Sequence, residues 1–136
     1  MKRNHLSFTA VYLFLILASF SFGCNQKENK TGRELIAGNS SKTWHASKLK
    51  NAAGNKESLS KEERQDVMQF YANGTFTINT ANQANNGTWT FNDNTKTLSL
   101  QFPDENVTQN FQVTDISEKE MQVRAGDGTD MTLRAQ

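Results

Sequence analysis

The chain has 136 residues, of which 35% are hydrophobic and 21% are charged, and its formal net charge at pH 7 is +1. This length suits one globular domain, and the near-neutral charge excludes the basic footprint of a nucleic-acid-binding protein. The chain has a single cysteine, so it has no partner for an intramolecular disulfide and no thiolate cluster for a zinc site.

Residues 1–23 have the composition of a secretory signal peptide. Lys2 and Arg3 form a basic start, and residues 10–18 are a run of nine residues without charged or strongly polar side chains. A membrane-spanning helix needs about 20 apolar residues, so this run predicts a signal-peptide core rather than a transmembrane segment. Without residues 1–23 the chain keeps 13 basic and all 14 acidic residues, which gives a net charge of −1.

The sole cysteine, Cys24, directly follows Gly23 and resembles the processing site of a bacterial lipoprotein. This resemblance implies cleavage between Gly23 and Cys24. The Cys24 thiol then carries a diacylglyceryl thioether, and its new amino group carries an acyl chain such as palmitate. Two or more acyl chains are needed for stable anchoring, because one chain alone binds a membrane only marginally. The alternative is an ordinary signal peptide in which the cysteine is incidental.

Residues 24–33 are polar and charged and contain no large apolar side chain, which predicts a flexible tether. The folded domain is then expected at residues 34–136. Asn25 is not the aspartate that is typical of retention in the inner membrane. We therefore expect a lipid-anchored protein of the outer membrane that faces the periplasm, with the cell surface as the alternative.

From Lys42 onward, apolar and polar residues alternate with a period of two, which is typical of half-buried strands. Turn residues such as Asn73-Gly74 separate the alternating segments, so the pattern predicts a meander of eight antiparallel strands. The larger residue of each pair would face inward, and these residues are Trp44, Met68, Phe70, Phe76, Ile78, Trp89, Phe91, Leu98, Leu100, Phe102, Phe111, Val113, Met121, Val123, Met131 and Leu133.

Eight consecutive antiparallel strands can close into a barrel, which removes the exposed sheet edges. We therefore predict an all-β fold, a short eight-stranded antiparallel up-and-down barrel, with an open curved sheet or a small sandwich as alternatives. Residues 50–65 interrupt the alternation with a long polar loop, in which Ser60 and Glu63 have capping-box spacing. Such a loop is either a lid or contact surface, or a tolerated insertion.

Three segments resemble the small lipocalin-like domains of lipoproteins from Gram-negative bacteria. Residues 35–44 combine Leu-x-x-Gly with a tryptophan on the first strand, residues 68–76 end in Asn-Gly-Thr-Phe, and residues 87–98 contain Gly-Thr-Trp followed by Lys-Thr-Leu. Together they extend the resemblance over residues 34–134. It implies a lipocalin-like barrel at residues 34–136 with a ligand pocket in its interior.

Aromatic residues make up seven of the sixteen inward positions and are the candidates for a ligand pocket or for the core: Trp44, Phe70, Phe76, Trp89, Phe91, Phe102 and Phe111. In a short barrel their bulk favours a packed core, with a cavity for one small ligand as the alternative. The inward positions carry no charge, so a ligand would be small and apolar or amphipathic. Arg124 and Arg134 fall on the opposite face of their strands, toward solvent.

Catalytic and metal-binding patterns are weak in this sequence. His45 is the only histidine after residue 23 and has no acidic neighbour, and Asp127 to Asp130 is typical of a hairpin turn. We expect no enzyme activity, no catalytic residues, no metal and no cofactor. The sequence favours a membrane-anchored lipoprotein that binds a small apolar or amphipathic ligand. The alternative is a structural or protein-interaction lipoprotein with a filled barrel core, which would bind a protein partner.

Overall fold

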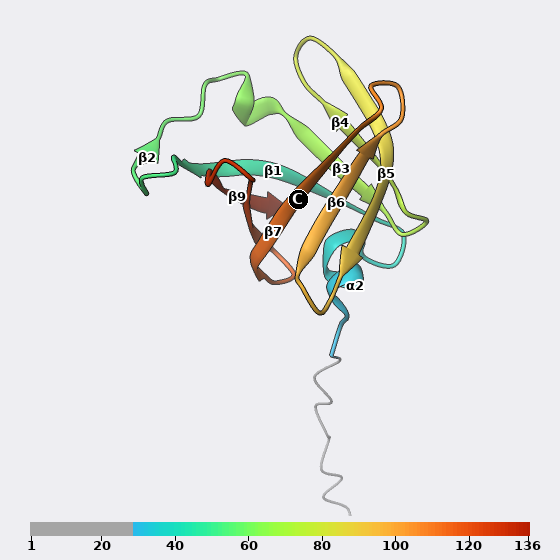
Figure 1. Ribbon diagram of the computed structural model, residues 1–136. Helices are drawn as coiled ribbons and strands as arrows, with labels where there is room; N and C mark the ends of the chain where they lie inside the picture. Colours follow the sequence, from blue (N-terminus) through green and yellow to red (C-terminus); the bar gives the residue numbers. More distant parts are fainter. Residues whose placement is uncertain (1–28) are drawn as a thin grey trace, which may run out of the picture.

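The computed structural model describes residues 29–136, which form a closed antiparallel barrel (Figure 1). The elements in chain order are α2 (Gly32–Ala37), β1 (Ser41–Lys50), β2 (Lys56–Glu57), the 3₁₀ helix η1 (Glu63–Gln65), β3 (Val67–Tyr71), β4 (Thr75–Asn79), β5 (Ala84–Asn92), β6 (Thr97–Phe102), β7 (Val107–Ile116), β8 (Glu120–Arg124) and β9 (Asp130–Ala135). The predicted eight-stranded up-and-down barrel is confirmed, with β2 as one extra strand.

Each barrel strand pairs with its neighbours in the chain, and pairing between β1 and β9 closes the barrel. Trp44 on β1 shows this closure, because it lies opposite Met68 of β3 on one side and Ala135 of β9 on the other. The tight turn between β3 and β4 contains Gly74, whose φ of 93° is a conformation that favours glycine. Closure rules out the open sheet and the sandwich that the alternating pattern also allowed.

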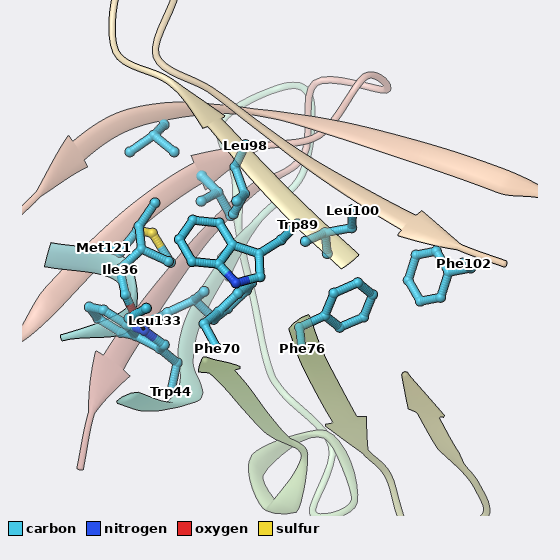
Figure 2. Close-up of a cluster of buried hydrophobic side chains, with 13 residues drawn as sticks. Ile36, Trp44, Phe70, Phe76, Trp89, Leu98, Leu100, Phe102, Met121 and Leu133 are labelled. Carbon is cyan, nitrogen blue, oxygen red and sulfur yellow. Dashed lines mark hydrogen bonds between the residues drawn. The ribbon is translucent and has the colours of Figure 1, made fainter. Parts of the chain in front are cut away.

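The inward side chains form one hydrophobic core (Figure 2). All sixteen residues expected to face inward are buried in this core or packed against it. At its centre, the Phe70 and Trp89 rings meet edge to face with their centroids 5.7 Å apart, and Phe76 meets Phe102 in the same way at 5.2 Å. Each such pair contributes about 0.5–1.5 kcal/mol beyond the area that it buries.

Helix α2 closes one end of the barrel and begins earlier than the sequence suggested (Figure 1). Thr31 caps it, because the Thr31 hydroxyl accepts from the Glu34 N–H and the Thr31 N–H donates to the Glu34 carboxylate at 2.8 Å. Ile36 and Ala37 are buried in the core. The folded part therefore begins with the cap at Thr31, within the segment predicted as a tether, because a capping box organises these polar residues.

The loop between β1 and β3 is more structured than its polar composition indicated. Its capping box forms as predicted, because the Ser60 N–H donates to the Glu63 carboxylate at 2.7 Å and the Glu63 N–H donates to the Ser60 hydroxyl at 3.1 Å. Strand β2, which the alternation did not reveal, pairs with the end of β1 through Leu49 and Glu57. Both β2 residues are exposed, so this hairpin lies outside the barrel.

The predicted signal peptide, the cleavage site at Gly23 and Cys24 and the first half of the predicted tether, residues 24–28, lie outside the described residues. Within residues 29–136, none of the helices has the length and apolar character needed to cross a bilayer.

Candidate functional site

The barrel contains a cavity of about 170 Å³ whose walls are almost entirely apolar. Ten of its twelve lining residues are apolar, and the other two carry an amide and a hydroxyl: Met68, Phe70, Ile78, Leu98, Leu100, Gln109, Phe111, Val123, Ala125, Thr129, Met131 and Leu133. This finding differs from the expectation of a filled interior. The volume is below the roughly 300–1,000 Å³ of usual ligand pockets, so the site suits a small molecule or one alkyl segment.

The two ends of the barrel differ in how they are filled. At the closed end, which holds α2 and the turns at residues 72–74, 93–96 and 117–119, the rings of Trp44 and Trp89 pack against the core. The indole N–H of Trp44 donates to the Ile36 carbonyl at 2.9 Å, and that of Trp89 donates to the Tyr71 carbonyl at 3.0 Å. The cavity lies toward the open end, where strands end at residues 50, 79, 102 and 124.

Two cations lie over these tryptophans at the closed end, and the residue pattern indicated neither of them. The guanidinium carbon of Arg33 is 4.5 Å from the centre of the Trp89 ring, and the Lys42 ammonium is 5.2 Å from that of Trp44. Lys42 also donates to the carbonyls of Leu35 and Glu118 at 2.8 and 3.0 Å. Its side chain is only 14% exposed. Lys42 thus connects α2 to the turn between β7 and β8. Because Lys42 lies two residues before Trp44 on the same strand, the alternation places its side chain on the inner face of β1.

The seven aromatic candidates divide between the cavity and the core. Phe70 and Phe111 line the cavity. Trp44, Phe76, Trp89 and Phe102 are buried outside its lining, and Phe91 is half-buried against the core. Most of the wall is aliphatic or sulfur-containing, because the aromatic rings gather toward the closed end and on β4 to β6.

Three residues of the cavity wall were absent from the predicted set: Gln109, Ala125 and Thr129. Each lies two positions from a predicted inward residue, toward the open end of the barrel: Gln109 from Phe111, Ala125 from Val123 and Thr129 from Met131. Residues two apart on a strand share a face. The alternation could therefore have found them. Small or polar side chains at these positions leave space at the open end.

A shallow depression adjoins the cavity on the outside of the barrel. Its lining residues are Gln109, Asn110, Phe111, Ala125, Gly126 and Asp127. Gln109, Phe111 and Ala125 also line the cavity. Asp127 lies in the turn between β8 and β9, where its carboxylate accepts from the Thr129 N–H at 2.8 Å. Hydrogen bonds from Thr129 lower the pKa of Asp127, so its carboxylate is ionised at neutral pH.

The remaining perturbed groups are exposed ion pairs. Hydrogen bonds from Lys30 and then Lys42 lower the pKa of Glu118. The Arg124 guanidinium donates to both Asp130 oxygens, at 2.7 and 3.1 Å, which lowers the pKa of Asp130 and raises that of Arg124. The side chains of Arg124 and Arg134 are 54% and 61% exposed, as the alternation indicated.

The His45 side chain lies on the face of β1 opposite Trp44, and its Nε2 is buried without a hydrogen-bond partner among the described residues. Across residues 29–136, no group of three His, Cys, Asp or Glu side chains could hold a metal ion. The cavity wall contains none of these residue types. What this site offers is therefore apolar surface with two uncharged polar groups.

Comparisons with known proteins agree with this architecture. The model of a family described as a lipocalin-like domain matches residues 41–123. The fold is similar to a lipocalin-like protein from Bacteroides uniformis, at 15% sequence identity and a TM-score of 0.55, over 68% of this chain and 94% of that one. It is also similar to a protein from Bacteroides eggerthii, at 13% identity and a TM-score of 0.57, over 69% and 97% of the two chains. No curated protein matches the chain.

Proposed function

The chain belongs to the lipocalin-like domain family. We propose that it is a membrane-anchored lipoprotein whose barrel binds one small apolar or amphipathic ligand. The apolar cavity of about 170 Å³ is the observation that carries the proposal. An apolar cavity of about 150 Å³ is enough for one benzene ring. The ligand therefore places about six to eight carbon atoms inside the barrel.

The affinity for the apolar part alone is modest. Each buried CH₂ group contributes about 0.8 kcal/mol, so six to eight of them contribute about 5–6 kcal/mol before the cost of association. This corresponds to a dissociation constant no tighter than about 20 μM. A natural ligand that binds more tightly must gain the difference from a polar group at the open end of the barrel.

The proposal assigns binding rather than catalysis to the domain. The groups with perturbed pKa values are exposed carboxylates and one guanidinium, and all of them are held in ion pairs or turns. Among the described residues, His45 lies on the outer face of β1 and away from the cavity wall. The cavity wall thus provides apolar contacts to a ligand of matching shape, and it contains no nucleophile paired with a base.

The anchoring part of the proposal rests on Cys24, on the apolar run at residues 10–18 and on Gly23 before the cysteine. Lipidation at Cys24 would hold the domain at the outer membrane, facing the periplasm. Replacing Cys24 with Ser should move the protein from the membrane fraction to the soluble fraction of a Gram-negative host. The variant Asn25→Ser keeps the cysteine and should stay with the membranes. If the two variants distribute equally between the membrane and soluble fractions, the anchoring proposal is wrong.

Native mass spectrometry of the purified protein tests the ligand directly. We expect a bound species of small mass, or one to appear after octan-1-ol is added. Ala125→Leu should weaken this binding, because Ala125 lines both the cavity and the depression beside it. Ala53→Leu makes the same change in an exposed loop and should leave binding unaffected. If octan-1-ol binds neither the parent nor the control, the barrel is not a carrier.

A further inference from the structure

The wall of the barrel is interrupted beside the cavity. The ladder between β7 and β8 ends where Gln112 lies opposite Arg124. Residues 107–111 of β7 continue beyond that point and pair with β6 alone. On the other side the chain turns away, since the Ala125 N–H donates to the Thr129 carbonyl at 2.9 Å within the turn between β8 and β9. Because a strand directs about half of its backbone groups toward each neighbour, the groups of residues 107–111 on the β8 side have no strand partner.

The depression and the cavity together form a site with an apolar and a polar part. Fifteen residues line the two, because three of their residues are shared. Among these fifteen described residues, Asp127 is the only charged one. Gln109 and Asn110 line the depression together with Asp127, and the amide oxygen of Asn110 already accepts from the Ser99 hydroxyl at 2.6 Å.

The neighbouring charges on β8, β9 and β1 lie outside the depression. The Arg124 guanidinium is paired with Asp130, and Lys50 lies opposite Asp130 in the register of β1 and β9. These three side chains belong to neither the cavity wall nor the depression. The depression therefore presents a net negative charge beside the opening of an apolar cavity.

We propose that the ligand of this site is an amphipathic primary amine, with an alkyl segment of six to eight carbons in the cavity and its ammonium group in the depression beside Asp127. This inference rests on the proposed function. An ammonium group has three donors and no acceptor. It matches the acceptors that line the site, which are the Asp127 carboxylate and the side-chain amide oxygens of Gln109 and Asn110. A fatty acid of the same length would place its carboxylate against that of Asp127.

Binding of three ligands with the same chain tests this inference: octylamine, octan-1-ol and octanoate at pH 7. The amine is protonated at this pH and the octanoate is ionised, as lysine and glutamate side chains are. The protein carries ¹³C-labelled methionine methyl groups, and the dissociation constants come from their NMR shifts. Met68 and Met131 line the cavity, whereas Met121 is fully buried outside its lining and serves as the internal control.

An exposed charge pair changes affinity modestly, so we expect octylamine to bind about three- to fivefold more tightly than octan-1-ol, and octanoate to bind more weakly than octan-1-ol. Asp127→Asn should abolish the advantage of the amine and leave the alcohol unchanged, because Asn keeps a carbonyl oxygen for the Thr129 N–H. Asp115→Asn removes the same charge from the other end of β7 and should preserve the preference for the amine.

Each other outcome has its own meaning. If the three ligands bind equally well, or if octanoate binds most tightly, the amine inference is wrong and the barrel remains an apolar binding site. If Asp115→Asn abolishes the preference as fully as Asp127→Asn, the preference reflects net charge and the assignment to the depression fails. If no ligand shifts Met68 or Met131, the proposed function itself fails.

Discussion

Replacing Ile36 with Ala tests whether α2 is an integral part of the barrel. Ile36 is 0% exposed and belongs to the same buried cluster as Trp44 and Met121. Truncating a fully buried isoleucine to alanine costs about 2–5 kcal/mol, from lost burial and from the cavity that remains. The Trp44 N–H donates to the Ile36 backbone carbonyl, so that hydrogen bond does not depend on the side chain. The expected loss is therefore one of packing alone.

Thermal unfolding followed by circular dichroism measures this loss. For a domain of this size, 1 kcal/mol changes the melting temperature by about 4 °C, so Ile36→Ala should lower it by about 8–20 °C. Val107→Ala is the control, because Val107 is 40% exposed and surface truncations change stability by about 0.5 kcal/mol or less. A melting temperature for Ile36→Ala within about 2 °C of the control would mean that α2 does not close the barrel in solution.

Three further substitutions test the core, a close strand contact and an ion pair. Phe76→Ala should destabilise the protein by about 3–5 kcal/mol in urea unfolding, and an unchanged midpoint would show that this face is not buried. Gly87→Ala should also destabilise, because a Cβ there would collide with the backbone carbonyl of Gln101 and the Phe76 ring; a stable variant would refute this packing. Hydrogen bonds from Lys30 and, to a smaller extent, Lys42 lower the pKa of Glu118 in the folded protein. The stabilisation that Glu118 provides is therefore complete above about pH 4.5, the value of a free glutamate, and is lost as the pH falls through the folded-state pKa. Glu118→Gln should therefore lower the melting temperature at pH 7 and progressively less below pH 4, and a difference that grows with acidification would contradict this.

The alternation of residues was sufficient to predict the strands and the barrel, because a strand's two faces follow from local order alone. Met68, Phe70 and Leu98, for example, all face inward as expected. The irregular features were not predictable in this way. A bulge between Ala46 and Lys48 shifts the register of β1 against β9, and nothing in those residue types indicates it.

The cavity could not be predicted from the same pattern, because it depends on how volumes are distributed along the barrel axis. Seven aromatic rings suggested a filled interior, yet only Phe70 and Phe111 reach the cavity wall. The closed end also buries a charged side chain that would be expected in solvent from its residue type alone. Lys42 packs over Trp44 because α2 supplies the Leu35 carbonyl as an acceptor for its ammonium group.

Contacts between a bound neutral ligand and the methionine methyl groups show whether the ligand occupies the barrel cavity, since Met68 and Met131 line the cavity and Met121 does not. With octan-1-ol bound, we predict intermolecular nuclear Overhauser effects from the alkyl chain to Met68 and Met131, and none to Met121. The absence of these effects at ligand concentrations of several millimolar, or effects to Met121 alone, would mean that the ligand does not bind in the cavity.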